Sequence, residues 1–416
     1  MDGLAEWAEI AEVRDARDDM RGVPFAFAID SHLGAETGTI NVLNAFRLAF
    51  WVKDRYVGRL EAPLVTEHPV VAGFARAAEL MLVDFPAAAY ATVLPHEIFG
   101  HGARLRELGL EASYQFLPTP PYGFDPSGTL PPPAFYAASP DERIVVLQSG
   151  IRVENFQARA ILRSAVRSRR LDHIDSGLLT GIKIHEVFEA SLPWESNDVR
   201  EWTTILAEKT GGSAEALQTR YLIGSVVTTF TNPTLLYAAY DVGWRFLVEG
   251  ERTGPLPAPT IDGVSLWFDT HVSPVPWGME YELTALARVH GVVLEATPRV
   301  GHGPGGGSAG FAADVSEWRV LPGLVLAGGV DVWVQPEIDF DRVRLGGLGL
   351  GVLSSGPPAR DRGRPGVRAY GETRFEHEGL FFGVRFGGKT RGLSGLASIQ
   401  AETEATGLVG VILGPP

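Results

Sequence analysis

The pattern of apolar and polar residues changes character near residue 255 of the 416-residue chain. Before that point apolar residues recur every three to four positions, which is typical of amphipathic helices. This spacing predicts helices near residues 4–11, 70–108, 142–170, 177–190, 197–209, 213–229 and 233–249. From about residue 264 apolar and polar residues alternate, which indicates strands. The sequence therefore predicts an α+β fold, with a mainly helical domain over 1–255 and an antiparallel β domain over 256–416.

The β half reads as about eight or nine strands of about 10 residues, joined by glycine-rich turns and without helices between them. Such a meander is expected to close into an up-and-down barrel, because closure removes its unpaired edges. Residues 23–30 and 40–51 are expected to add strands that complete it. One face of each strand is apolar and the other carries Arg, Glu, Asp and Tyr, which favours a transmembrane barrel facing lipid. A soluble barrel or sandwich is the alternative.

Composition narrows the functions that are possible. The net charge is −14 and the pI about 5.2, which argues against a nucleic-acid partner. The chain has no cysteine, so any metal must be bound by His, Asp or Glu. Because no run of about 20 apolar residues is evident, no transmembrane helix is expected. The chain begins without a basic and apolar leader, so no signal peptide is expected.

The segment His96-Glu97-Ile98-Phe99-Gly100-His101 carries the strongest chemical signal, because it places two imidazoles and a carboxylate on one predicted helix. The common zinc motif H-E-x-x-H has its histidines at i and i+4. Here they stand at i and i+5, which lie about 140° apart on a regular α-helix. Both can face one metal only if the helix absorbs the extra residue. The spacing therefore predicts a π-bulge between residues 96 and 101, eased by Gly100.

This segment resembles the H-E-x-x-G-H motif of the dipeptidyl peptidase III family of zinc peptidases. In that family the third zinc ligand is a glutamate on a second helix, roughly fifty residues downstream. Glu154 lies 154 − 101 = 53 residues beyond His101, on an expected helix from about Gly150 to Arg170. The second motif matches only in part, because Val153 and Arg159 stand where the family has acids. The resemblance covers about 60 of the residues, and the rest of the chain does not share it.

The resemblance implies a gluzincin-like site in which one zinc ion is bound by His96, His101 and Glu154, with Glu97 as the general base. The coordination chemistry of zinc is consistent with the same roles, because three protein ligands leave the fourth position of the zinc ion for water. The metal lowers the pKa of that water toward about 7, and the adjacent carboxylate accepts its proton. The expected activity is a zinc-dependent hydrolase acting on a peptide or protein.

Further candidates surround this motif. His185 is expected to orient a ligand or steady an oxyanion, and Tyr240, with Tyr237, to donate to a tetrahedral intermediate. The alternatives are a surface or core histidine and tyrosines that only pack. The proline-rich segment 117–133 separates the two ligand helices. It is expected either to line the site or to be a plain surface connection.

Three hypotheses follow from these patterns. The first is a zinc peptidase attached to or inserted in a β-barrel of the bacterial outer membrane, in contact with its lipid. The second is a barrel that binds metal for structure or transport, with a fourth protein ligand such as His185 or Glu142 closing the site. The third is a metallohydrolase of the periplasm or another soluble compartment, with a β module that binds substrate.

Overall fold

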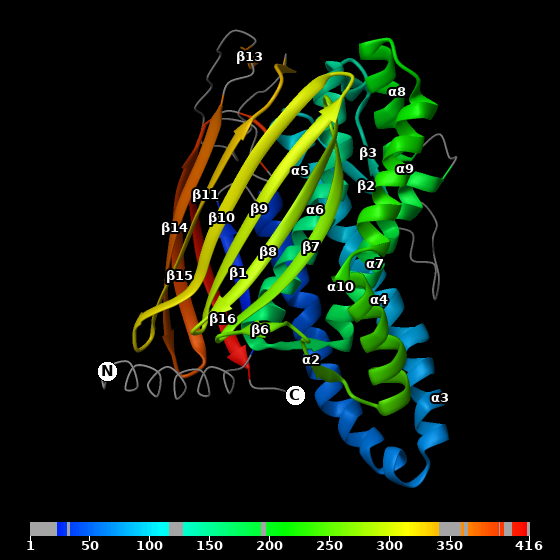
Figure 1. The fold of residues 1–416 in the computed structure, drawn as a ribbon, viewed down its shortest axis with the longest axis vertical. Helices are drawn as coiled ribbons and strands as arrows, with labels where there is room; N and C mark the ends of the chain where they lie inside the picture. Colours follow the sequence, from blue (N-terminus) through cyan, green and yellow to red (C-terminus); the bar gives the residue numbers. More distant parts are fainter. Residues whose placement is uncertain are drawn as a thin grey trace.

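The computed structural model describes residues 23–30, 34–115, 128–192, 197–340, 359–361, 365–390, 392–394 and 402–413. A layer of helices packs against one large, curved antiparallel sheet, and the blue helices near the N-terminus extend beyond the lower ends of the strands (Figure 1). The expected α+β class is confirmed. The expected helix near residues 4–11 lies outside the described residues.

The helical layer is centred on α6 (Pro140–Ser168), a long helix with most of its residues buried. It begins at a capping box in which Ser139 and Glu142 each accept a hydrogen bond from the backbone of the other. The other helices are α2 (Ala35–Glu67), α3 (Pro69–Glu79), α4 (Phe85–Leu94), α5 (Gly102–Glu107), α7 (His173–Ser191), α8 (Asp198–Thr210), α9 (Ala214–Phe230) and α10 (Pro233–Tyr240). Three π-helical segments join them, η1 (Leu80–Asp84), η2 (Pro95–His101) and η4 (Asp241–Glu249), and η3 (Pro133–Phe135) is a 3-10 turn.

The large sheet is a ten-stranded meander in the order β1-β16-β15-β14-β11-β10-β9-β8-β7-β6. Its strands are β1 (Val23–Asp30), β6 (Thr260–Ile261), β7 (Val264–Val275), β8 (Gly278–Val289), β9 (Val292–Gly303), β10 (Gly306–Leu321), β11 (Leu324–Val334), β14 (Gly366–His377), β15 (Leu380–Lys389) and β16 (Glu402–Leu413). Three short pairs lie outside it: β2 (Ser113–Gln115) with β3 (Gly128–Leu130), β4 (Arg170–Asp172) with β5 (Thr253–Pro255), and β12 (Ile338–Phe340) with β13 (Ala359–Asp361). The long strands keep the sequence order, as the alternation predicted.

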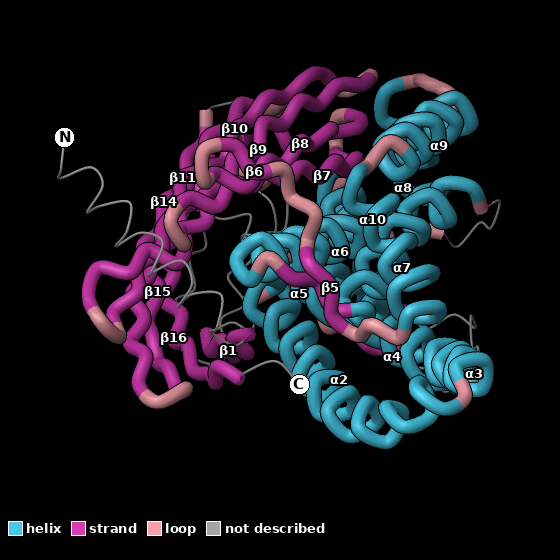
Figure 2. The backbone as a smooth tube through the Cα atoms, turned by 60° about the horizontal axis from the view of Figure 1, so that its bottom comes forward, coloured by secondary structure: helices cyan, strands magenta, loops and turns pink. Residues whose placement is uncertain are grey.

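The prediction of a closed barrel is wrong. Among the described residues β1 and β6 end the sheet without pairing to each other, and the helices stand across its open side (Figure 2). Residues 23–30 form the expected strand, paired with β16. Residues 40–51 do not form a strand, because they belong to α2. Within α2, Leu43, Phe46 and Phe50 recur at helical spacing and pack into the core.

Side chains from α2 cover the free edge of β1. Asn41 accepts a hydrogen bond from the Ala28 N–H (2.7 Å) and donates to the Ala28 carbonyl (2.8 Å). Asn44 donates to the carbonyl of Ala26, two residues earlier on the same edge (2.5 Å). These amides replace the partner strand that a closed barrel would supply.

Side chains from α7, α8 and the N-cap of α10 cover the edge of β7 beyond the short β6 in the same way. Asn232 and Lys183 both donate to the carbonyl of Thr270, at 3.0 and 2.7 Å. The indole of Trp202 donates to the carbonyl of Val275 at 3.1 Å. Both ends of the open sheet are therefore sealed by the helical layer.

The inner face of the sheet is charged, and α6 supplies the opposite charges. Each of four arginines on α6 pairs with a glutamate on β8, β9 or β10: Arg152 with Glu280 (2.9 Å), Arg159 with Glu282 (3.5 Å), Arg163 with Glu295 (2.6 Å) and Arg167 with Glu317 (3.2 Å). The outward positions of the same strands are apolar and exposed, as Leu283, Leu294 and Phe311 illustrate. The sheet thus has many charged residues on its inner face, where it meets α6, and apolar residues on its outer face.

One helical run also differs from expectation. Pro69–Glu107 is long and apolar enough to cross a membrane by length and composition alone. No such helix was expected, because its apolar residues are interspersed with Glu79 and Asp84 and include many alanines.

The sealed β7 edge predicts that Asn232→Leu strongly destabilises the fold. The variant loses the cap of α10 and leaves Asp269, to which Asn232 donates at 2.6 Å, with one hydrogen bond fewer. We expect the free energy of unfolding, measured by urea titration and circular dichroism, to fall by about 3 kcal/mol. The exposed neighbour Thr231→Ala is the control and should change it by less than about 0.5 kcal/mol. Equal stability of both variants would contradict the sealing role of Asn232.

Candidate metal centre

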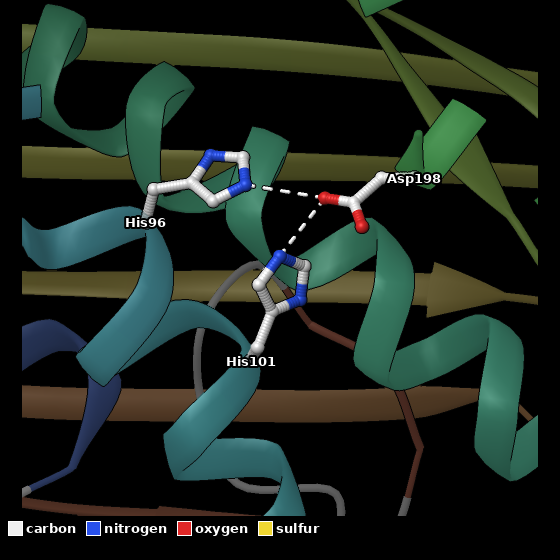
Figure 3. Close-up of side chains that lie close together, drawn as sticks. All are labelled: His96, His101 and Asp198. Atoms are coloured by element: carbon white, nitrogen blue, oxygen red, sulfur yellow. Dashed lines mark hydrogen bonds and ion pairs between the residues drawn. The ribbon is translucent and has the colours of Figure 1, made fainter. Parts of the chain in front are cut away.

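The predicted π-bulge is confirmed, because Pro95–His101 forms the π-helical segment η2. The wider turn brings both histidines to one side, with ring centroids 4.8 Å apart. Their Nε2 atoms converge on one carboxylate oxygen, Asp198 Oδ2, at 3.2 Å from His96 and 2.9 Å from His101 (Figure 3). The one-residue excess over the common zinc motif is thus accommodated in the backbone.

Two glycines allow η2 to lie against α6. A Cβ on Gly100 would come within 2.8 Å of the Gly150 Cα, and a Cβ on Gly150 would overlap the ring of His96. The expectation for Gly100 was relief of helix distortion. The structure gives it a second role, because only glycine permits this close approach of two backbones.

The remaining ring nitrogens fix the tautomers of both histidines. His101 Nδ1 lies 2.8 Å from the carbonyl of Val146, which can only accept, so this nitrogen carries the proton. His96 Nδ1 lies 2.5 Å from Glu154 Oε1 and donates to it. Burial lowers the pKa of both imidazoles, but the hydrogen bonds and charges of the nearby carboxylates, Asp198 above all, outweigh it and raise the pKa of both. A metal would therefore displace a proton from each Nε2 atom, and the Nδ1 hydrogen bonds leave Nε2 as the nitrogen that could bind it.

Asp198 was not identified from the sequence. It is the first residue of α8, after the N-cap Asn197, where an acid is expected simply because it stabilises the helix dipole. Nothing in the local pattern distinguishes it from such a residue. Burial would raise the pKa of its carboxyl, but the two histidines outweigh that effect and hold the pKa below its usual range.

Glu154, the ligand implied by the family resemblance, lies between two imidazoles. It accepts from His96 Nδ1 and from His185 Nδ1, the latter at 2.9 Å. Burial raises the pKa of Glu154, yet the charges and hydrogen bonds of His185 and His96 lower it to about 2. Two sets of donor atoms therefore cluster within 4.8 Å, His96 with His101 and Asp198, and His96 with Glu154 and His185.

Glu97 is buried beside the histidines and is held by the end of the proline-rich segment. The backbone N–H and the hydroxyl of Thr129 on β3 both donate to Glu97 Oε2, at 2.7 and 2.8 Å. This part of the segment therefore contacts the site, while residues 116–127 lie outside the described residues. The carboxylate is positioned by a different element from the one that carries it.

Of the other residues predicted near the site, one joins the histidine cluster and the rest are engaged elsewhere. His185 joins the cluster through Glu154, whereas the Glu142 carboxylate is engaged in the cap of α6. Tyr237 donates to the carbonyl of Pro255 on β5, beside the C-terminal end of α6. Tyr240 contacts Tyr237 and is half exposed. That end of α6 is about 22 Å along the helix from Glu154, so the structure does not bring Tyr240 to the histidines.

A second cluster, formed by Asp54, Glu79 and His173, also has metal-binding geometry. Its carboxylates already face cations of the chain. Lys53 lies 2.7 Å from Glu79, and Arg252 lies 2.9 Å from Asp54. These ion pairs make it a charge network within the helical layer, so the His96 cluster remains the candidate metal centre.

The donor set suits a zinc ion. Two neutral imidazole nitrogens and one carboxylate oxygen are ligands that zinc accepts in catalytic sites, where a water completes the tetrahedron. The next residue along the chain from His96 is a fixed carboxylate, as metal-assisted hydrolysis requires. The arrangement is therefore chemically suited to activating water.

The close packing at Gly150 predicts that Gly150→Ala weakens metal binding, because the new methyl displaces the His96 ring. We expect the dissociation constant for zinc, measured by competition with a chromophoric chelator, to rise at least about tenfold. Gly181→Ala is the matched control, since Gly181 is exposed on α7 and a Cβ there meets nothing within 4 Å. Equal affinity of the two variants would contradict the packing argument.

Comparison of the chain with protein-family models, curated proteins and solved structures finds no match. The resemblance of the His96–His101 segment to a zinc-peptidase motif stays a prediction from the sequence. What the protein does has to be inferred from the geometry of the site itself.

Proposed function

We propose that this protein is a zinc-dependent hydrolase whose metal is held by His96 Nε2, His101 Nε2 and Asp198. The convergence of both Nε2 atoms on the Asp198 carboxylate carries the proposal. The hydrogen bonds at the two Nδ1 atoms support it, since they leave the converging Nε2 atoms as the ones that would bind the metal once it has displaced their protons. The zinc ion would polarise the substrate carbonyl and make a bound water acidic.

Glu97 is the general base in this proposal. Thr129 fixes its Oε2 atom, so the carboxylate is held in one orientation near the two histidines. It would accept the proton of the attacking water and deliver it to the leaving group. The motif favours a peptide or protein substrate, because the resemblance is to zinc peptidases.

Glu154 has a supporting role in this scheme. It binds the nitrogen of His96 that faces away from the metal position, and such partners orient the ring and raise its basicity. Glu154 also holds His185, which places a second imidazole next to the site. The family resemblance implies instead that Glu154 is the third ligand, and the two assignments can be separated by substitution.

The second candidate function is a metal site without catalysis, and the cluster of Glu154 and His185 around His96 is the observation that favours it. If these residues completed the metal's coordination with His101, no position would remain for water. Such a site would serve structure or transport. Turnover of a zinc-loaded protein decides between the two.

We also propose that the protein resides in a lipid membrane, that of the bacterial outer envelope being the one expected for an outward-apolar meander. The exposed apolar residues of the sheet and its charged inner face support this location. The alternative is a protein of the periplasm or another soluble compartment with the same metal centre.

Metal content tests the ligand assignment. We expect the purified chain, stripped with a chelator and dialysed against zinc, to retain about one zinc per chain. His96→Ala and Asp198→Ala should each reduce this to about a tenth or less, while Glu154→Gln should lower the affinity only about 10- to 100-fold. Glu208→Ala, which changes an exposed acid on α8, is the matched control. Elemental analysis by mass spectrometry gives the readout.

An unchanged zinc content in His96→Ala would refute the site. If Asp198→Ala retains zinc while Glu154→Gln loses it, the third ligand is Glu154, as the resemblance implies. Each outcome therefore assigns the ligands differently.

Turnover tests the base. Zinc-loaded protein should cleave members of a library of internally quenched fluorescent peptides, and Glu97→Gln should reduce the rate by about 10²- to 10⁴-fold while retaining zinc. Glu111→Gln, at an exposed glutamate, should behave as the wild type. A zinc-loaded wild type that cleaves no peptide would favour the non-catalytic alternative. Unimpaired cleavage by Glu97→Gln would exclude Glu97 as base.

A further inference from the structure

We propose that the helices form part of the lipid-facing wall, so that strands and helices together present one continuous apolar surface to the membrane. This inference rests on the proposed membrane location and adds to it. Helices would then face the lipid on the side where a closed barrel would have further strands.

The sheet contributes strands of the length that a bilayer requires. Apart from the short β6 and β1, its strands have 10 to 16 residues, and 12 is the commonest length. Twelve residues span about 40 Å, or about 28 Å when tilted by about 45°, close to the apolar band of a membrane. Outward residues such as Phe382 and Phe386 are each 63% exposed. In water such a surface would be costly to maintain.

The helical layer also exposes apolar side chains, on a different side of the molecule. Six of its exposed apolar residues come from α3, η1 and α9: Val70, Phe74, Leu82, Ile223, Val227 and Phe230. In the most apolar 18-residue stretch of Pro69–Glu107, only 17% is buried within the protein. A core helix of a soluble protein would be mostly buried, so this run is unlike one. Figure 2 places α3 and α9 across the helical layer from β14 and β15.

The hydrogen bonds along the sheet edges reduce the main cost of placing an open sheet in a membrane. An open sheet cannot lie in hydrocarbon, because its edge N–H and C=O groups would have no partners. Here Asn41 of α2 bonds both backbone groups of Ala28 on the edge of β1, and Asn232, Lys183 and Trp202 donate to the carbonyls of Thr270 and Val275 on the edge of β7. The helices satisfy their own backbone groups internally. A mixed wall of strands and helices is therefore compatible with lipid on its outside.

Lipid fits this surface better than a second copy of the chain does. The apolar residues lie both on the sheet and across the helical layer from it, whereas one partner molecule covers one patch. The sheet supports the same conclusion, because ion pairs such as Arg152–Glu280 and Arg163–Glu295 lie between α6 and its inner face. A charged inner face with an apolar outer face is the arrangement of strands that face lipid.

The chain has no cysteine, so single cysteines can be introduced without background labelling. We would place them on the sheet (Leu283→Cys, Phe382→Cys), on the helices (Phe74→Cys, Val227→Cys) and at a strand turn (Glu378→Cys, a side chain 85% exposed). Each full-length variant carries an environment-sensitive fluorophore and is reconstituted in vesicles of phosphatidylcholine and phosphatidylglycerol. Brominated acyl chains quench labels in lipid, and iodide quenches labels in water.

We expect bromolipid quenching at all four sheet and helix positions, and iodide quenching at residue 378. Sheet labels in lipid with helix labels in water would overturn the mixed wall and leave the membrane location standing. Iodide quenching at every position would refute both. Shielding of the four labels without vesicles, together with a dimeric mass, would identify a second copy as the occupant and overturn the inference. His96→Ala should give the wild-type pattern, which separates these outcomes from failure of the hydrolase proposal.

Discussion

The buried helix α6 has to satisfy two different neighbours at once, and the rest of the structure depends on how it does so. Val146, Gly150 and Glu154 are spaced four residues apart, so they form one face, and that face meets the two histidines of η2. Arg152 and Arg159 point about 180° away from it, toward the glutamates of the sheet. One face therefore positions the His96 cluster while the other anchors the sheet.

The predictions that depend on local helix geometry are confirmed, whereas a contact that depends on tertiary packing was missed. The i, i+5 spacing of His96 and His101 predicted the π-helical turn, because helix geometry leaves no other way for both rings to reach one ion. Glu154 was implied by the family resemblance, which sets the distance of the third ligand along the chain, and it does contact His96. Asp198 was missed because its place at the start of α8 has an ordinary local explanation, and its approach to the histidines depends on tertiary packing.

The sheet was also predictable only in its local features, because the way in which its edges are covered depends on tertiary packing. Alternation predicted its strands and their order, including β1, but it cannot report what stands between the first and last strand. The asparagines that seal the edges, such as Asn41 and Asn232, look like ordinary helix and cap residues in the sequence. Residues 40–51 were assigned to a strand because a short apolar run fits either period. Only the packing of Leu43 and Phe50 into the core identifies the helix.

The contact between Thr129 and Glu97 has a consequence for control. The histidines are held by α6, whereas the carboxylate beside them is held by β3, at the end of the proline-rich segment. A shift of β3 would release the carboxylate without disturbing either imidazole. A metal ion bound by the histidines would then lack the positioned carboxylate beside it until β3 returned to Glu97. Binding of a metal and positioning of the Glu97 carboxylate would thus depend on different parts of the chain.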